Sequence, residues 1–139
     1  MNQTKVILFQ VRKSSEKLKK IFETSQSHFQ KKESLLILTE NEAASEYVDH
    51  LLWNYRPTSF LPHIISHTPT SEKIVISHAK INLNSTQYVF NLNPTPLLIE
   101  SPFKIIYDFE DMTSSSKNRL SSLRFDAYKK AGFIIEASF

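Results

Sequence analysis

The sequence predicts a single α/β domain in which helices cover both faces of a mostly parallel sheet, a three-layer α/β/α arrangement. Short runs of β-branched and aromatic residues lack polar alternation, as strands buried on both faces do. Helical periodicity follows two of these runs, and strands joined by helices pair in parallel. At 139 residues the chain fits one domain, which we place over residues 1–139.

The first half of the chain alternates strands with helices. Residues 5–11, with the apolar run Val6-Ile7-Leu8-Phe9, and residues 35–38 are of the kind found in buried strands. A helix is predicted between them, with Ser14 or Ser15 as its N-cap and with its end near Lys31, where cations suit the helix dipole. Its apolar face is formed by Leu18, Ile21, Phe22, Ser25 and Phe29.

A second helix is predicted after the second strand. Thr39 and Glu42 have the spacing of a capping box, and Pro57 limits the helix at its other end. The apolar stripe of this helix comprises Ala44, Tyr47, Val48, Leu51 and Leu52.

The second half of the chain is less regular until its last helix. Turn-rich segments separate candidate strands at residues 60–65, 73–77, 87–92 and 103–109. Residues 114–116 offer serine N-caps for a long helix, Gly132 is placed to end it, and residues 133–135 form a closing strand. The predicted apolar face of this helix is Leu120, Leu123, Ala127 and Ala131.

Composition excludes several classes of function. The chain has no cysteine, which excludes disulfides, thiolate metal sites and cysteine nucleophiles. Its single glycine, Gly132, cannot build a Gly-rich phosphate cradle, so we expect a Rossmann-like topology without a nucleotide-binding loop and without a cofactor. A net charge of +3 is small for a nucleic-acid binder. Because no membrane-spanning run or signal peptide is recognised, a cytoplasmic protein is expected.

Two groups of residues carry possible catalytic or metal chemistry. Asp108, Glu110 and Asp111 end a predicted strand, where open α/β sheets gather ligands, and with a histidine they would serve a small metal-dependent hydrolase. A solvated, helix-capping loop is the alternative that we favour. His63 and His67 have helical ligand spacing, but proline and β-branched neighbours argue against a helix there. We therefore expect structural or surface histidines, no metal site and no catalytic residue.

The predicted last helix carries a basic stripe. Lys117, Ser121, Arg124 and Tyr128 fall together on a helical wheel, and Arg119 adds a cation elsewhere on the helix. One interpretation is a solvated face. Another is a cradle for an acidic segment, because guanidinium groups bind carboxylates bidentately and a neighbouring aromatic ring accepts an apolar residue. Direct binding of single-stranded DNA is a competing hypothesis.

Aromatic residues cluster where the second helix gives way to the next strand. The only tryptophan, Trp53, lies close in sequence to Tyr55, Phe60, Leu61 and Pro62. Such a group is most often part of a core. Protein–protein hot spots have the same composition, and we predict that Trp53, Phe60, Leu61 and Pro62 form a docking surface.

Two segments resemble the chi subunit of bacterial DNA polymerase III, an accessory protein of the clamp-loader assembly. The first is Leu52-Trp53 followed by Ser59-Phe60-Leu61-Pro62-His63. The second is the run Arg-Phe-Asp-Ala-Tyr-Lys-Lys-Ala-Gly-Phe at residues 124–133. Element order and length also agree over nearly the whole chain, although residues 66–110 contain no motif of the family.

The resemblance implies a non-catalytic adaptor with a nucleotide-binding-like fold that binds no nucleotide. It implies that Trp53 and Phe60 belong to a surface for the psi subunit of the clamp loader or, alternatively, a repair helicase. It also implies that the acidic, phenylalanine-ending tail of single-stranded DNA-binding protein binds near Phe125.

The last helix departs from the family pattern at this tail site. Asn118 and Ser122 stand where well-studied members carry basic residues, and Asp126 replaces a cation. Either basic residues at shifted positions supply the charge, or tail binding is weakened or absent. Because the helix remains net basic, we expect the shifted set, which is Lys117, Arg119, Arg124, Phe125 and Tyr128.

Overall fold

The computed structural model describes residues 4–98 and 103–138. The described strands are β1 (Lys5–Val11), β2 (Leu35–Leu38), β3 (Ile64–Ile65), β4 (Ile74–Ser77), β5 (Tyr88–Asn91), β6 (Ile105–Asp111) and β7 (Ile134–Ser138). The described helices are α1 (Ser14–Gln30), α2 (Glu42–Asn54) and α3 (Ser115–Lys130). The α/β class predicted from the sequence is confirmed.

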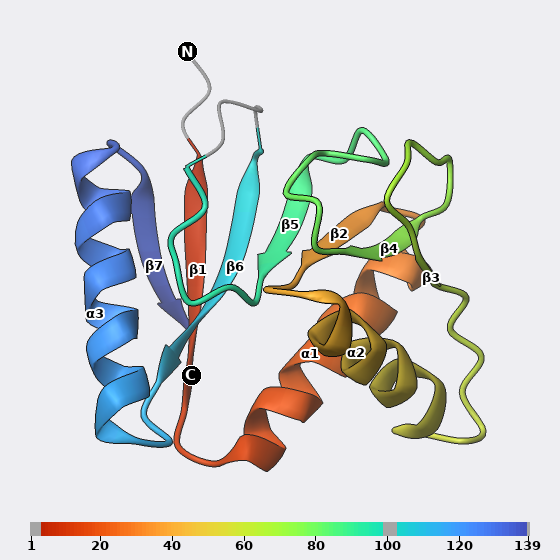
Figure 1. Ribbon diagram of the computed structural model, residues 1–139, viewed down its shortest axis with the longest axis horizontal. Helices are drawn as coiled ribbons and strands as arrows, with labels where there is room; N and C mark the ends of the chain where they lie inside the picture. Colours follow the sequence, from red (N-terminus) through yellow and green to blue (C-terminus); the bar gives the residue numbers. More distant parts are fainter. Residues whose placement is uncertain (1–3, 99–102, 139) are drawn as a thin grey trace.

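The seven strands form one sheet in the order β3-β4-β2-β5-β6-β1-β7. All six neighbouring pairs are parallel. Helices α1 and α2 cover one face, and α3 covers the other near β1, β6 and β7 (Figure 1). No helix in the described part of the chain is long and apolar enough to span a membrane.

Strand β2 shows how the sequence builds two cores at once. Its four residues are fully buried, and successive side chains point to opposite faces. Leu35 and Ile37 pack beneath α1 and α2, whereas Leu36 and Leu38 belong to the cluster that includes Tyr128 of α3. An apolar run without alternation is therefore what a central parallel strand requires.

The start of α1 differs from the prediction. Its N-cap is Lys13, and the predicted caps Ser14 and Ser15 lie in the first helical turn. The Glu16 carboxylate accepts hydrogen bonds from the backbone N–H groups of Arg12 and Lys13 at 2.8 and 2.9 Å. A glutamate at the third helical position thus satisfies the backbone N–H groups of the N-cap residue and of the residue before it, which is the reciprocal half of a capping box.

The start of α2 differs as well, because Asn41 and not Thr39 is the N-cap. The Asn41 side-chain oxygen accepts the backbone N–H of Ala44 at 2.9 Å. Thr39 is fully buried, and its hydroxyl lies 2.6 Å from that of Ser45. The Thr39–Glu42 capping box was wrong because the hydroxyl is used inside the core.

Strand lengths account for the other differences. The segment predicted as a strand at residues 60–65 is a strand only at Ile64–Ile65. By contrast, β6 continues to Asp111, which lies opposite Val11 in the parallel register with β1. The acidic residues at 108–111 therefore belong to a paired strand, and the solvated loop that we favoured is wrong.

Helix α3 is rotated relative to the predicted apolar face. Its buried residues are Ser121, Arg124 and Tyr128, whereas Leu120 and Leu123 are 39% and 56% exposed. The end of the helix is as predicted. Gly132 has a φ of 84°, and the N–H groups of Gly132 and Phe133 donate to the carbonyls of Lys129 and Tyr128.

Candidate functional site

An exposed aromatic pair lies where α2 ends. Trp53 is in the last turn of α2 and is 47% exposed, while Phe60, in the following loop, is 78% exposed. We call Trp53 and Phe60 the aromatic surface. Leaving side chains of this size in water forgoes roughly 1.5–3 kcal/mol of burial each, which makes an exposed pair more informative than a buried one.

The loop beneath the aromatic surface is anchored in the core. Leu61, next to Phe60, is 1% exposed, and Pro62 is partly buried. Tyr55 packs on Phe22 of α1 with ring centroids 4.9 Å apart. The anchored neighbours therefore hold Phe60 outward. Of the four residues predicted to form a docking surface, Trp53 and Phe60 are exposed, whereas Leu61 and Pro62 support them from below.

His63 joins α2 to this loop. Its ring is buried, with Nδ1 2.7 Å from the Leu61 carbonyl oxygen. Its Nε2 lies 3.2 Å from both the carbonyl and a carboxylate oxygen of Asp49. The ring also lies against the Trp53 indole, with centroids 4.3 Å apart. His63 is thus a structural residue, as expected. His67, which shares the helical ligand spacing with His63, lies against His78.

The second candidate region is the buried polar face of α3. Arg124 is 6% exposed, Tyr128 is fully buried, and both contact Asp108 of β6, which is 1% exposed. The Arg124 Nε lies 3.2 Å from Asp108 Oδ1, and the Tyr128 hydroxyl donates to Oδ2 at 2.7 Å. We call Asp108, Arg124 and Tyr128 the buried polar cluster.

Burial raises the pKa of the Asp108 carboxyl, while the Arg124 guanidinium and the Tyr128 hydroxyl favour its charged form. The same burial, together with the negative charge of Asp108, raises the pKa of Tyr128, so its hydroxyl stays protonated and donates. Asn91 of β5 adds donors from its side-chain amide to the Tyr128 oxygen at 3.1 Å and to Asp108 at 3.4 Å. The cluster is a satisfied ion pair within a hydrogen-bond network.

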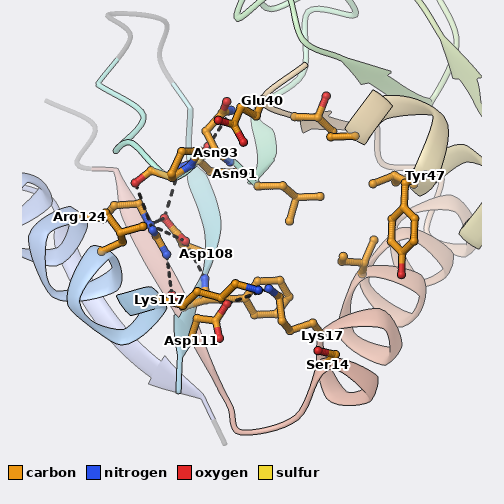
Figure 2. Close-up of a pocket in the computed structure, with 18 of the residues that line it drawn as sticks. Ser14, Lys17, Glu40, Tyr47, Asn91, Asn93, Asp108, Asp111, Lys117 and Arg124 are labelled. Atoms are coloured by element: carbon orange, nitrogen blue, oxygen red, sulfur yellow. Dashed lines mark hydrogen bonds and ion pairs between the residues drawn. The ribbon is translucent and has the colours of Figure 1, made fainter. Parts of the chain in front are cut away.

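A pocket of about 420 Å³ opens at the carboxyl ends of β2, β5 and β6. Figure 2 shows Arg124 and Asp108 on one wall and Tyr47 on the opposite wall. Lys117 lines it from the first turns of α3, and Leu18 and Leu120 are among its apolar residues. This is the position at which open parallel sheets bind ligands.

A second ion pair lies at the base of this pocket. Lys17 Nζ is 2.8 Å from Asp111 Oδ2, and Asp111 also accepts hydrogen bonds from Thr113. Burial opposes ionisation of Asp111, but the hydrogen bonds from Lys17 and Thr113 outweigh it and lower the pKa. Glu110 instead accepts a hydrogen bond from Gln10 at 2.6 Å.

The contacts of the acidic residues of β6 concern the alternative function considered from the sequence, a small metal-dependent hydrolase. Asp108, Glu110 and Asp111 each have a separate partner on a different element, and in the described chain no three histidine, aspartate or glutamate side chains converge as a metal site requires. The alternation of strand β6 places Asp111 on the opposite face of the sheet from Asp108 and Glu110. Asp108 and Glu110 share a face but have different partners, Arg124 of α3 and Gln10 of β1.

The five residues expected to bind an acidic tail are not brought onto one surface. Lys117 and Arg119 are exposed, and Phe125 is partly buried against the α3 side of the core. Arg124 and Tyr128 are inside the buried polar cluster. Sequence reasoning assigned that stripe to the surface because its residues are polar, and it did not connect Arg124 with Asp108 or Asn91. The i, i+3, i+7 spacing of Ser121, Arg124 and Tyr128 was the available signal of a core-facing stripe.

The family model of the DNA polymerase III chi subunit, HolC, matches residues 4–136. That range includes every described helix and all but the last residues of the sheet. No protein with a curated description matches the chain.

Proposed function

The chain belongs to the DNA polymerase III chi subunit family, and from that premise we propose that it is a non-catalytic adaptor within the replication machinery. Chi is an accessory subunit of the polymerase, so the protein acts by binding other replisome proteins. In this proposal the aromatic surface binds a psi-like clamp-loader subunit or a repair helicase. A second surface binds the acidic tail of single-stranded DNA-binding protein. We place this activity in the cytoplasm, where bacterial DNA is copied.

The observation that carries the proposal is the exposure of Trp53 and Phe60 above an anchored loop. Tryptophan is enriched in binding hot spots, and an anchored loop loses little conformational entropy when a partner binds. Arg56 lies between the two aromatic residues in sequence, is exposed, and has its guanidinium carbon 5.4 Å from the Phe22 ring centroid. A partner with an apolar segment and acidic neighbours would match this chemistry.

Titration of the full chain with a purified psi-like subunit tests the first surface. Trp53→Ala and Phe60→Ala are each expected to weaken binding more than about tenfold, as removal of a hot-spot residue does. Ile81→Ala is the matched control, because Ile81 is 58% exposed but lies in a different loop. Equal binding by all three variants would contradict the proposal for this surface.

The tail-binding surface is proposed at the pocket beside α3. Lys117 lines the pocket together with apolar Leu18 and Leu120, which suits an acidic segment that ends in a phenylalanine ring and a carboxylate. Arg119 is exposed two residues further along α3 and adds positive charge to the helix. In this proposal Arg124 and Tyr128 support the pocket wall and do not bind the tail directly.

A peptide carrying an acidic, phenylalanine-terminated tail tests this surface. Binding is expected to weaken with added salt and to be lost in Lys117→Glu, since the new charge repels the tail. Lys129→Glu makes the same charge change at the far end of α3 and is expected to bind normally. No binding by the unmodified chain at millimolar peptide would contradict tail recognition. Tight, salt-dependent binding of bare oligonucleotide would instead favour direct single-stranded DNA binding.

A further inference from the structure

The contacts of His63 restrict its protonation state. Nδ1 faces the Leu61 carbonyl oxygen, and Nε2 faces two oxygens of Asp49. All of these oxygens are acceptors, so every one of these contacts is a hydrogen bond only when each ring nitrogen donates a proton. A neutral imidazole has one N–H and one lone pair, which would place a nitrogen lone pair against an oxygen at 2.7 or 3.2 Å. The geometry therefore fits the doubly protonated, cationic ring.

The cation occupies the junction beneath the aromatic surface. It joins Asp49 of α2 to the loop residue next to Phe60, and its ring supports the Trp53 indole. Among the described residues, Asp49 is the charged side chain that contacts the His63 ring, and it is about one-third exposed. Trp53 and Leu61, the other contacts, carry no charge. The two rings are tilted by 41° with their centroids 4.3 Å apart, a distance at which a cation is attracted by an indole ring.

We propose that His63, held as an imidazolium between Asp49 and the Leu61 carbonyl, is the positioning residue of the aromatic surface. Loss of its proton removes either the hydrogen bond to Asp49 of α2 or the hydrogen bond to the Leu61 carbonyl within the loop, which frees Trp53 and Phe60 to move relative to each other. The proposal rests on the docking role of that surface. It adds that partner binding is strongest when His63 is protonated and weakens as the pH rises.

The first test needs no partner. Nitrogen-15 NMR of the full chain is expected to show protons on both ring nitrogens of His63 at neutral pH, and a single-proton tautomer there would overturn the proposal. Because Trp53 is the only tryptophan, its fluorescence also reports the contact. A protonated imidazole quenches indole emission more strongly than a neutral one, so emission is expected to rise with pH.

His63→Gln and His67→Gln form a matched pair for this fluorescence titration, which runs from acidic pH to above neutral pH. The rise in Trp53 emission is expected to disappear in His63→Gln and to persist in His67→Gln, since His67 does not contact the indole. An unchanged rise in His63→Gln would overturn the proposal. If His63→Gln does not fold, the NMR result on the unmodified chain still decides.

The second test uses the psi-like subunit as the probe. His63→Gln is expected to bind about tenfold more weakly than the unmodified chain at low pH, with the difference narrowing as pH rises. Failure of the unmodified chain to bind would count against the proposed function, while the NMR and fluorescence outcomes would still judge the role of His63. Equal binding by both proteins at every pH would overturn the positioning role.

Discussion

The aromatic surface and the buried polar cluster reverse the usual distribution of residue types. Trp53 and Phe60, apolar and large, stand in solvent, whereas Arg124 and Asp108, both charged, are at most 6% exposed. The difference lies in what each side chain finds around it. Arg124 meets a carboxylate and the carbonyl oxygens of Pro94 and Phe109, so its charge and donors are satisfied inside the protein.

This comparison shows that burial is decided by partners as much as by polarity. A charged side chain can be buried when a partner on another element satisfies it, although such a pair contributes little net stability. An aromatic side chain can stay exposed when its neighbours already fill the core, as Leu61 and Tyr55 do beside Phe60 and Trp53. The exposed pair is then free to bind another protein.

The largest expected effect comes from breaking the buried polar cluster. Asp108→Ala leaves the Arg124 guanidinium buried without its counter-ion and is expected to lower the free energy of unfolding by about 3–5 kcal/mol. Urea unfolding measures this change. Asp126→Ala removes an exposed carboxylate from α3, the helix that carries Arg124. Its free energy of unfolding is expected to stay within about 0.5 kcal/mol of that of the unmodified chain. A similar, small change in both variants would mean that Asp108 and Arg124 are not a buried pair.

The next effect contrasts two adjacent residues. Leu61→Ala is expected to cost about 2–5 kcal/mol of unfolding free energy, because Leu61 is 1% exposed and the substitution leaves a cavity. Phe60→Ala removes a larger side chain, yet its cost is expected to stay below about 0.5 kcal/mol because Phe60 is exposed. Thermal or urea unfolding of both variants checks the contrast. A large loss of stability in Phe60→Ala would show that the ring packs within the protein.

The smallest effect concerns the Lys17–Asp111 pair. The folded-state pKa of Asp111 lies below its ordinary value of 3.8, so its contribution is fully present above that value and is lost as the pH falls through the lowered folded-state pKa. Asp111→Asn is expected to cost about 1 kcal/mol at neutral pH, since the pair is partly exposed.

Unfolding free energies at neutral and acidic pH check this prediction. The difference between the unmodified chain and Asp111→Asn is expected to shrink as Asp111 becomes protonated. Glu110→Gln is the control on the same strand, because glutamine keeps an acceptor for Gln10. A difference that is constant with pH would show that the charge of Asp111 does not stabilise the fold.

Much of the fold follows from local pattern. The apolar runs at β1 and β2, the face of α1 with Ile21 and Phe22, and the left-handed Gly132 were all predicted, because each depends on short-range periodicity or backbone preference. The cap of α1 was missed because Glu16 in the first turn, and not a serine hydroxyl, accepts the backbone donors at the helix start. The cap of α2 was missed because the Thr39 hydroxyl is used inside the core, which leaves Asn41 as the N-cap.

The sequence by itself determined the α/β class, the positions of the helices and main strands, and the aromatic segment around Trp53. Only the tertiary structure decided which face of α3 is buried, because that depends on Asp108, sixteen residues before Arg124 and on another element. It likewise decided that Trp53 and Phe60 are exposed while Leu61 is not. A sequence pattern specifies which residues share a face, but the partners that the fold brings opposite that face determine whether it lies inside or outside.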